Sequence, residues 1–572
     1  MPLDTAARRT SLLVAEELSA GFALDSRLGA WQSTAPACVR LAPNAGDIAD
    51  YLHDESKLAS AGVSSLAVPH SLAELRDVMS WHAAEHHMVA VSGTRTGVAG
   101  GAVPEAGAHL VSMAELRGVL RVDANGEVPT ASVLGGTWLS ELTGYLATHH
   151  EGLVFPVDPT ETSASFGGMV STNAGGARSY RFGSMRPWVQ GLTVELASGR
   201  TLHLTRGVQR AAGGRLDLRD GADERRLEIG AIPKPSTKNA IGPGFELDGD
   251  ALDLFVGAEG TLGVVSEVTV RLFRTLESRM GFLQFFDSVP QAFAFVNALR
   301  AAPTLRTTAM EFLDARSHDL ARESGRASVD RVLQGAPSNS CSVFVEIAYD
   351  GDDELATIVD RLEDMVAGAG GDTRTSLAGA SEGELKDIRA FRHAVPERVN
   401  AIIAQRREQH PGLHKIATDM SVRDADLSWI FGLYQERLTA AGLDFAVFGH
   451  VGNNHFHVNI LPRDEGELER AKGIYAGFAR DVVERGGAVS AEHGIGRIKS
   501  RFLAVQFDAS TMQALRAVKR WADPEWRLNR GVLIEPEAED EKTGRREDER
   551  TRRREDEKSG GPLAVDGGVE GR

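Results

Sequence analysis

The chain has 572 residues, of which 42% are hydrophobic and 25% are charged. This composition excludes a disordered chain, a collagen-like repeat and a small disulfide-rich protein. The 80 acidic residues outnumber the 63 basic ones and give a net charge of −17. Because nucleic-acid-binding proteins carry basic surfaces, we expect no nucleic-acid partner.

Only Cys38 and Cys341 are present, too few for a disulfide framework or a cysteine-ligated iron–sulfur cluster. Glu16 and Glu17 interrupt the N-terminal region, so it lacks the apolar core of a secretory signal, and no uncharged apolar run long enough to cross a membrane follows. We therefore expect a cytoplasmic protein without a membrane span. The length predicts about three lobes or two large domains with a cleft between them.

The first half of the chain predicts a mixed α+β lobe. Residues 1–60 are expected to form a mixed N-terminal segment of helix and loop, and the lobe that follows spans 61–275. Helical spacing over 71–87 begins with Ser71 as the N-cap and Glu74 three positions later, which is a capping box. A short strand, 89–91, then leads into a glycine-rich segment, and β-rich pieces follow over 191–204 and 254–273.

The second lobe is predicted to span 276–504 and to consist of one open sheet covered by helices. A further segment, 505–536, is expected to return to the first lobe. The expected strands are 280–286, 342–349 and 445–461, and the expected helices are 289–300, 354–369, 384–406 and 465–485.

The end of the chain, 537–572, is predicted to be a disordered charged tail. Its first 22 residues contain 18 charged side chains, and such a segment buries too little apolar surface to offset the entropy of ordering it. We assign it no catalytic role.

Three glycine-rich segments carry the first functional signal. The dinucleotide fingerprint and the triphosphate-binding loop are both absent. Instead, a strand runs into Gly93–Gly101, whose amides could cradle a pyrophosphate, although such a loop is as often a simple tight turn. Phe166–Gly176 contains two glycine pairs that a flat ring could lie against, and Gly257–Gly263 is the third segment.

In this order and spacing, the three segments resemble the FAD-binding domain of the vanillyl-alcohol oxidase and p-cresol methylhydroxylase family. The resemblance implies an α+β, two-lobed fold, with a p-cresol-methylhydroxylase-type FAD-binding domain and an α+β substrate (cap) domain. Arg95 stands where the family usually has a glycine. The first loop has no His or Cys for a covalent link, so we expect noncovalent FAD. The cofactor-binding residues implied by the resemblance are Gly93, Thr96, Gly97, Gly100, Gly101, Gly167, Gly168, Thr172, Asn173, Gly176, Glu259, Gly260 and Gly263.

A histidine-rich segment in the second lobe suggests a metal site. His450 and His457 lie seven residues apart, and Glu492 supplies a carboxylate. Two imidazoles with one carboxylate suit Zn, Fe or Mn and leave coordination positions open. His455 and His457 alternate along a predicted strand, and an isolated pair of this kind is more often an ordinary core or surface pair.

The same segments resemble the branch that contains FAD-linked D-lactate dehydrogenases, the glycolate oxidase flavoprotein subunit and D-2-hydroxyglutarate dehydrogenase. The resemblance makes His450, His457 and Glu492 the metal ligands and leaves His455 as an ordinary histidine. It makes His493 the general base, a role suited to a group that titrates near neutral pH.

Two cations are candidates for holding the substrate. Arg392 resembles an arginine that binds the substrate carboxylate, and guanidinium groups suit that geometry. Lys415 is a second candidate, with a solvated surface role equally open. Pro396 replaces a threonine of the D-2-hydroxyglutarate subgroup, which favours a D-lactate-like or glycolate-like substrate. Ser381 fits a hydrolase nucleophile pattern, but it reads better as a helix cap.

The sequence thus predicts an FAD-dependent dehydrogenase that oxidises a D-2-hydroxy acid with metal assistance. Electrons would leave to a separate acceptor, such as a protein, a quinone or a cytochrome, and whether the protein forms a homodimer stays open. Three alternatives remain: a metal-dependent hydrolase built on His450, His457 and Glu492, an FAD enzyme of the ether-lipid synthase type, and a flavin-binding protein without catalysis.

Overall fold

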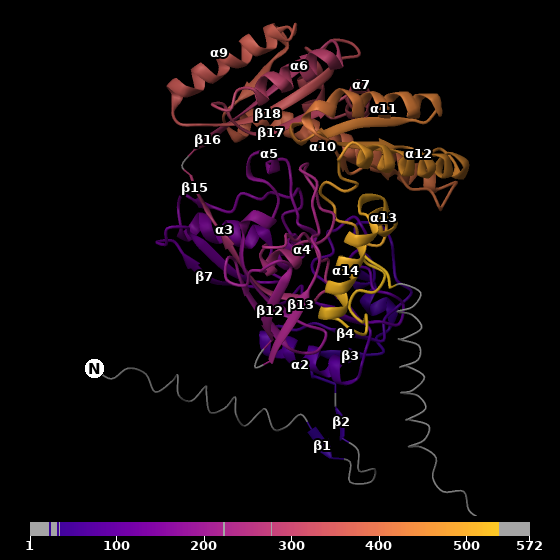
Figure 1. Cartoon of the computed structure of the whole chain (residues 1–572). Helices are drawn as coiled ribbons and strands as arrows, with labels where there is room; N and C mark the ends of the chain where they lie inside the picture. Colours follow the sequence, from indigo (N-terminus) through magenta and orange to yellow (C-terminus); the bar gives the residue numbers. More distant parts are fainter. Residues whose placement is uncertain (1–21, 25–30, 34, 221–222, 276, 537–572) are drawn as a thin grey trace, which may run out of the picture.

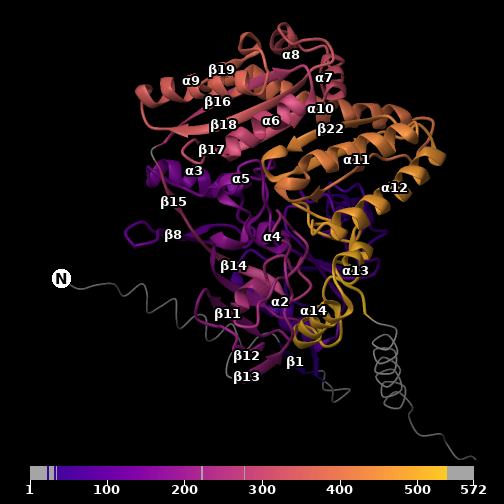
Figure 2. The ribbon, with the colours of Figure 1, turned by 45° about the horizontal axis from the view of Figure 1, so that its top comes forward.

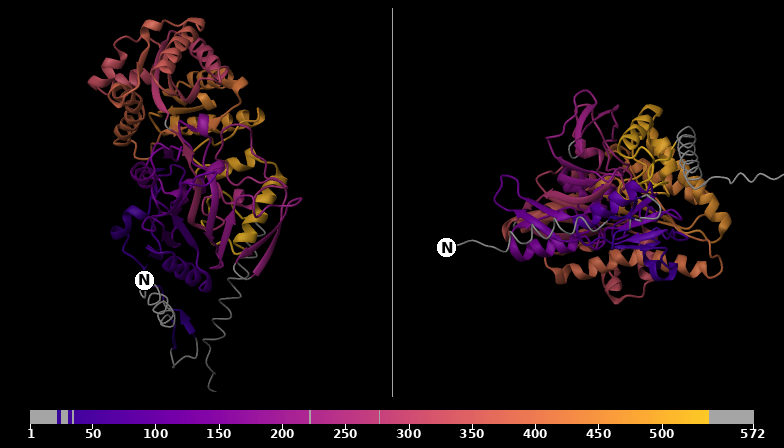
Figure 3. Two further views of the ribbon diagram at one scale, coloured as in Figure 1. Left: turned by 90° about the vertical axis from the view of Figure 1, so that its left-hand side faces the viewer. Right: turned by 90° about the horizontal axis from the view of Figure 1, so that it is seen from below.

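The computed structural model describes residues 22–24, 31–33, 35–220, 223–275 and 277–536. Two lobes are stacked along the long axis of the molecule, with the second lobe, in orange, above the first, in indigo and magenta (Figure 1). The view turned by 90° shows the same elongated arrangement (Figure 3). The charged tail and most of the first 34 residues lie outside the described residues, so the predictions made for them stay predictions.

The first lobe is built around two sheets. The smaller one contains parallel pairs formed by β4, β6 and β5, and the five-stranded one is antiparallel. In sheet order, the strands of the two sheets are β3 (Val39–Leu41), β4 (Ser65–Ala67), β6 (His109–Ser112) and β5 (Val89–Ser92), then β11 (Thr201–Thr205), β10 (Val189–Glu195), β14 (Val264–Arg271), β8 (Thr130–Leu134) and β7 (Val119–Asp123).

Short helices and strand pairs complete the first lobe. The helices are α2 (Leu72–Ala84), α3 (Leu139–His149), α4 (Phe166–Thr172) and α5 (Ser179–Phe182), with 3-10 turns η1 (Ala45–Tyr51), η2 (Arg186–Trp188) and η3 (Ala251–Leu254). The strand pairs are β1 (Phe22–Leu24) with β2 (Trp31–Ser33), β12 (Arg215–Asp220) with β13 (Asp223–Glu228), and β9 (Leu153–Val154) with β15 (Phe273–Arg274).

Ser71 begins α2 as predicted. Its side chain accepts a hydrogen bond from the Glu74 amide at 3.2 Å, which satisfies one of the unpaired amides at the helix start. The Glu74 carboxylate accepts from the His70 amide rather than from the Ser71 amide. The helix ends at Ala84, three residues earlier than predicted, because the chain turns through His86 in the left-handed region, at φ +53°, toward β5.

The second lobe contains the largest sheet of the described chain, with eight antiparallel strands. Successive side chains of a strand point to opposite faces, so Phe282 and Phe286 enter one core while Leu283 and Phe285 enter another. In sheet order the strands are β19 (Leu377–Gly379), β16 (Ser278–Phe286), β18 (Cys341–Tyr349), β17 (Arg306–Leu313), β22 (Phe445–His450), β23 (His455–Ile460) and β20 (Ile416–Ala417), with β21 (Met420–Ser421) beside β23.

Helices cover both faces of this sheet (Figure 2). On one face lie α7 (Ala315–Arg322), α8 (Ala327–Leu333) and α10 (Glu382–Arg407); on the other lie α6 (Val289–Arg300), α9 (Asp352–Gly368), α11 (Leu427–Ala440) and α12 (Glu465–Glu484). The α+β, two-lobed prediction is therefore confirmed. Among the described residues, no helix combines the length and the apolarity that a membrane crossing requires.

The capping box at Ser381 is also confirmed. Its hydroxyl accepts from the Glu384 amide, and the Glu384 carboxylate accepts from the Ser381 amide at 2.9 Å, so Ser381 opens α10. Two predicted strands were wrong in extent. Residues 445–461 form a hairpin of two strands rather than one, and 254–263 form turns, because Gly257, Glu259 and Gly260 have positive φ.

After the second lobe the chain returns to the first. The helices α13 (Leu503–Gln506) and α14 (Ala509–Ala522), in yellow, lie against the first lobe (Figure 1). Beyond α14, Asn529 donates from its side chain to the Glu259 carbonyl at 2.8 Å and accepts from the Val91 amide at 2.7 Å. The last described segment therefore links β5, which leads into the first glycine-rich segment, to the third glycine-rich segment.

Candidate functional site

One cavity of about 360 Å³ joins the glycine-rich segments of the first lobe to the histidine-rich hairpin of the second. Most of the predicted site residues line it: Gly93, Thr96, Gly97, Gly101, Gly167, Gly168, Thr172, Glu259, Gly260, Gly263, His450, His457, Glu492 and His493. Five predicted residues do not line it: Gly100, Asn173, Gly176, Arg392 and Lys415.

The first glycine loop follows β5 and forms one end of the cavity. A Cβ built on Gly97 would meet no protein atom within 4 Å, whereas one on Gly93 would lie 2.4 Å from the Ser165 hydroxyl oxygen. Arg95 has φ +60°, a conformation that favours glycine, which accounts for the usual glycine there. Its guanidinium lies 4.7 Å from the centre of the Tyr51 ring.

The second glycine segment, which includes α4, forms a side wall. A Cβ on Gly168 would meet only the Ser165 hydroxyl, at 3.0 Å, but one on Gly176 would lie 1.9 Å from the Asp158 carbonyl oxygen. Asn173 ends α4 at φ +51°, and its side chain is bonded to backbone groups of Asn239 and Arg186. Gly176 and Asn173 thus shape the wall by packing rather than by facing the cavity.

The third glycine segment connects the cavity to the second lobe. Glu259 has φ +50°, and its two carboxylate oxygens accept from the amides of Ile495, at 2.7 Å, and Gly496, at 2.8 Å. Burial raises the pKa of Glu259 to about 7 despite these two hydrogen bonds. A Cβ on Gly260 would lie 2.5 Å from the Asn529 side-chain nitrogen, so this glycine permits close packing.

These features fit a flat, extended cofactor such as FAD. Many of the lining residues are glycine, alanine, serine or threonine, and a Cβ at Gly97 would project into open space instead of protein. Backbone amides exposed in such a loop are suited to a pyrophosphate. The residues of the glycine segments would therefore be able to hold FAD.

The histidine cluster is formed by the β22–β23 hairpin and the loop after α12. The Nε2 of His450 lies 3.1 Å from Glu492 Oε2, and the Nε2 of His457 lies 4.0 Å from the same oxygen. His455 joins them, with its Nδ1 3.7 Å from that oxygen. Each of the four residues offers a donor atom within 4.8 Å of the others.

His455 differs from the other three because it does not line the cavity and its side chain is fully buried. Its Nε2 lies 3.0 Å from Asp419 Oδ1, yet among the described residues neither ring nitrogen has a well-aligned hydrogen-bond partner. The sequence predicts a ligand set without His455, and in the structure His455 lies next to these ligands.

Two buried charges on either side of the cluster were missed by the sequence reading. Glu311, on β17, places Oε1 2.5 Å from His450 Nδ1, and Lys238 places Nζ 3.4 Å from Glu492 Oε1. Burial would lower the pKa of His450, but the carboxylates of Glu311 and Glu492 raise it to about 9. Burial opposes ionisation of Glu492, but Lys238 and His450 hold its pKa well below the usual value.

Asp419 organises the loop that carries Glu492 and His493. Its carboxylate accepts from the amides of Glu492, at 3.1 Å, and His493, at 3.0 Å, and pairs with Lys499 Nζ at 2.6 Å. The Nδ1 of His493 lies 3.5 Å from Asp419 Oδ2. Burial lowers the pKa of His493, and the Asp419 charge partly offsets this, so the ring is neutral at pH 7.

The two predicted substrate cations lie away from the cavity wall. Arg392, on α10, reaches the cluster through Glu311, with its Nη2 3.2 Å from Glu311 Oε2. Burial, and then the charge of Lys57, lowers the pKa of Lys415. Lys415 does not line the cavity on which the histidines open.

The donor set itself fits a divalent metal ion. Neutral imidazoles and an ionised carboxylate are ligands for Zn, Fe and Mn, and His450 is already oriented by Glu311 on its other ring nitrogen, as metal-binding histidines usually are. A bound cation would take the place of the proton that His450 otherwise holds. His450, His457 and Glu492 are thus able to hold such an ion beside the glycine wall.

Comparison with known families matches both lobes. The family model described as "FAD binding domain" matches residues 63–205, and the one described as "FAD linked oxidases, C-terminal domain" matches residues 276–533. The first match contains the first two glycine segments, and the second contains the histidine cluster.

Relatives of known name match along most of the chain. A D-2-hydroxyglutarate dehydrogenase from Xanthomonas citri pv. viticola is 28% identical over 521 residues, covering 89% of this chain and 97% of the relative. A D-lactate dehydrogenase from Anaerostipes hadrus is 26% identical and covers 85% and 92%. A Bacillus subtilis glycolate oxidase subunit is 24% identical and covers 88% and 95%.

Solved structures support the fold. The structure of p-cresol methylhydroxylase with substrate bound aligns with a TM-score of 0.61 at 13% identity, covering 87% of this chain and 94% of that one. An alkyldihydroxyacetonephosphate synthase aligns with a TM-score of 0.59 at 15% identity, covering 91% and 84%. With both domain matches in sequence order and relatives along nearly the whole chain, the protein belongs to the family of FAD-linked oxidoreductases.

Proposed function

We propose that this protein is an FAD-dependent dehydrogenase that oxidises a small D-2-hydroxy acid to the 2-oxo acid. The observation that carries the proposal is the shared cavity. Its glycine wall suits a flavin, and its opposite wall presents His450, His457, Glu492 and His493. A substrate in this space would lie between the electron acceptor and the groups that handle its proton.

The reaction removes a hydride from the carbon and a proton from the hydroxyl group of the substrate. Bound FAD, held noncovalently, supplies the hydride acceptor. A divalent ion held by His450, His457 and Glu492, most suitably Zn, Fe or Mn, would polarise the hydroxyl oxygen and lower its pKa. FAD would accept the hydride and the ion would polarise the hydroxyl group, and the residues of the chain would hold both in place.

His493 is the proposed general base. Its ring lines the cavity and is stacked at 5.3 Å from the His457 ring, so it is adjacent to the metal ligands. A neutral imidazole can accept the hydroxyl proton as the hydride leaves. Asp419, bonded to the His493 amide and close to its Nδ1, would orient the ring and stabilise it once it is charged.

The proposed substrate is a monocarboxylate of the lactate or glycolate type. Arg392 is the proposed partner of the substrate carboxylate, although in the structure the Arg392 guanidinium pairs with Glu311. Pro396 lies inside α10 at the position where the resembled dicarboxylate subgroup has a threonine, and a proline offers no hydroxyl donor there. Relatives named for D-lactate, glycolate and D-2-hydroxyglutarate set the class of substrates to test.

The decisive experiment is an anaerobic reduction screen of the purified FAD-loaded protein. We expect D-lactate or another small D-2-hydroxy acid to bleach the flavin absorbance near 450 nm, and the L-enantiomer to leave it unchanged. Bound flavin that no 2-hydroxy acid bleaches would contradict the proposal and favour an FAD enzyme without net oxidation. A protein that cannot be loaded with FAD would favour a metal-dependent hydrolase.

A further inference from the structure

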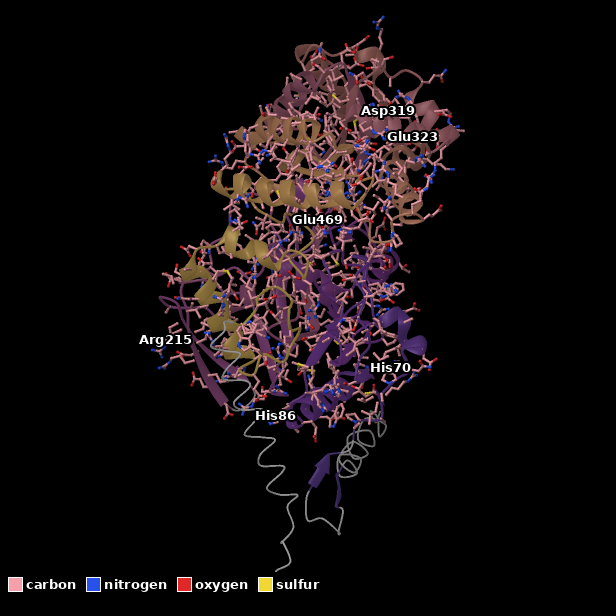
Figure 4. The ribbon with its side chains drawn as sticks, turned by 90° about the vertical axis from the view of Figure 1, so that its right-hand side faces the viewer. His70, His86, Arg215, Asp319, Glu323 and Glu469 are labelled. Atoms are coloured by element: carbon pink, nitrogen blue, oxygen red, sulfur yellow. The ribbon has the colours of Figure 1, made fainter. Side chains whose placement is uncertain are left out.

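A second group of histidines lies in the first lobe, outside the cavity. His82 is in the last turn of α2, His87 precedes β5, and His109 opens β6. Each offers a ring nitrogen, and these three atoms lie within 4.8 Å of one another. Figure 4 shows His86, the neighbour of His87, at the end of the first lobe that faces away from the second lobe. This group is therefore remote from the histidines at the cavity.

The spacing of the rings matches that of metal ligands. The Nδ1 atoms of His82 and His87 are 3.1 Å apart and form a hydrogen bond with each other in the structure. Two nitrogens bound at about 2.0–2.1 Å to one tetrahedral zinc ion lie roughly 3.3–3.4 Å from each other. The Nδ1 of His109 lies 2.8 Å from the Ser65 hydroxyl, which leaves its Nε2 available. Metal-binding histidines commonly use their second nitrogen for such a hydrogen bond.

The surroundings keep the imidazoles neutral, the form that binds metal. Burial lowers the pKa of His82 to about 3 and that of His109 to about 4. The neighbouring Arg527 is already engaged: its guanidinium donates to the carbonyls of His82, at 2.9 Å, and Ala197, at 3.1 Å, and pairs with Glu525 at 3.1 Å. Its positive charge also lowers the pKa of His82 and of His87, which favours their neutral form.

We propose that His82, His87 and His109 form a second metal site, which binds a divalent transition-metal ion such as Zn²⁺. Three imidazoles without a carboxylate suit Zn²⁺, Cu²⁺ or Ni²⁺ and do not suit Mg²⁺ or Ca²⁺, which require oxygen ligands. The half-buried positions of His87 and His109 leave a way in for the ion and a free coordination position for water.

The site would join three separate chain segments behind the flavin-binding wall. His82 belongs to α2 and His109 to β6, while β5 runs directly from His87 to Gly93, the first glycine of the cavity. An ion held there would fasten the base of the strand that presents this loop. Its role is structural, and it takes no part in the chemistry at the cavity.

The competing explanation is plain aromatic packing. The His87 and His109 rings stack at 3.7 Å, and Trp81 lies 4.6 Å from the His82 ring and 4.8 Å from the His87 ring. Neutral rings can stack in this way without any ion. The two explanations differ in one measurable quantity, the zinc bound per chain.

The test uses the full-length FAD-loaded protein, stripped with chelator, incubated with excess zinc sulfate and desalted before metal analysis. The variant is His87→Asn and the matched control is His86→Asn. His86 is the adjacent histidine, largely exposed, paired with Glu525 and at φ +53°, which asparagine tolerates. We expect His87→Asn to hold one zinc ion fewer per chain than the parent, and His86→Asn to hold as many as the parent.

Because the result is a difference, it does not depend on whether the cavity histidines bind metal. Equal zinc content in the parent and in a folded, flavin-loaded His87→Asn protein would overturn the proposal. A second protein, His457→Ala, covers the case in which His87→Asn fails to fold. It should still bind one zinc ion per chain, with a higher melting temperature in zinc, and binding of none would equally overturn the proposal.

Discussion

The glycine wall and the histidine wall of the cavity are held in place by different kinds of interaction. The glycine wall positions its surface by backbone packing, as at Gly176, where even a methyl group would overlap the Asp158 carbonyl. The histidine wall positions its side chains through buried charges, with Glu311, Lys238 and Asp419 each in contact with a functional residue. We therefore expect added side-chain volume to disrupt the glycine wall, and the loss of a buried charge to disrupt the histidine wall.

The largest effect is expected at Gly176. We expect Gly176→Ala to lose FAD and several kcal/mol of unfolding free energy, because its Cβ would be 1.9 Å from the Asp158 carbonyl oxygen and backbone cannot easily yield. Flavin-to-protein absorbance and urea unfolding measure this. Gly144→Ala, in α3, is the control, since Gly144 does not line the cavity and its Cβ would meet no protein atom within 4 Å. Normal flavin content in Gly176→Ala would break the volume argument for this wall.

Lys238 connects the two walls, because its ammonium donates to the Gly176 carbonyl at 3.2 Å and pairs with Glu492. Removing one partner of a buried pair leaves the other charge uncompensated, so Lys238→Met should cost about 3 kcal/mol of unfolding free energy. Added metal should recover part of this loss, since a cation would compensate Glu492 directly. A cost below 1 kcal/mol without metal would show that charge does not organise the second wall.

A smaller effect is expected when Glu311 is replaced. Glu311→Gln keeps the shape but removes the charge that orients His450, and partners of this kind usually contribute 10- to 100-fold to metal affinity. We expect the zinc dissociation constant of the cavity site to rise by about that factor, as measured by competition with a chelator. Flavin content should remain normal. A loss of flavin instead of metal affinity would contradict the assignment of Glu311 to the histidine wall alone.

The smallest effect concerns the pH dependence of flavin reduction, which reports on the histidine wall. His493, the proposed base, would act in its neutral form, and burial lowers its pKa from the ordinary value of 6.5. The rate of flavin reduction should therefore change little between pH 7 and 8 and fall only below pH 6.5, as the ring becomes protonated. Stopped-flow measurements across this range check it. A rate that already declines between pH 8 and 7 would be inconsistent with a lowered pKa.

The same contrast explains how much could be predicted from the sequence. The glycine wall depends on local backbone conformation, so contiguous segments such as 93–101 and 166–176 carried its signature, and most of the predicted glycines line the cavity. The partners of the histidine wall come from distant positions. Glu311 lies in a strand that the sequence reading did not identify, and nothing near Lys238 relates it to Glu492.

One signal could have pointed to Glu311. It is a single charged residue in the apolar run Ala309–Leu313, and a charge buried in a strand requires a partner. Asp419 offered a weaker signal, because aspartate is common in turns. Arg392 and Lys415 were chosen by residue type, and since neither lines the cavity, their role toward a substrate carboxylate stays a prediction.

We propose that the two walls form one catalytic site in which His493 removes the substrate proton. The most direct test is the rate at which a D-2-hydroxy acid bleaches the flavin of the His493→Ala protein without oxygen, compared with the parent. We expect normal flavin and metal content with a rate about 10²- to 10⁴-fold lower. A His493→Ala protein that holds flavin and metal and reduces its flavin at the parent rate would contradict the proposal.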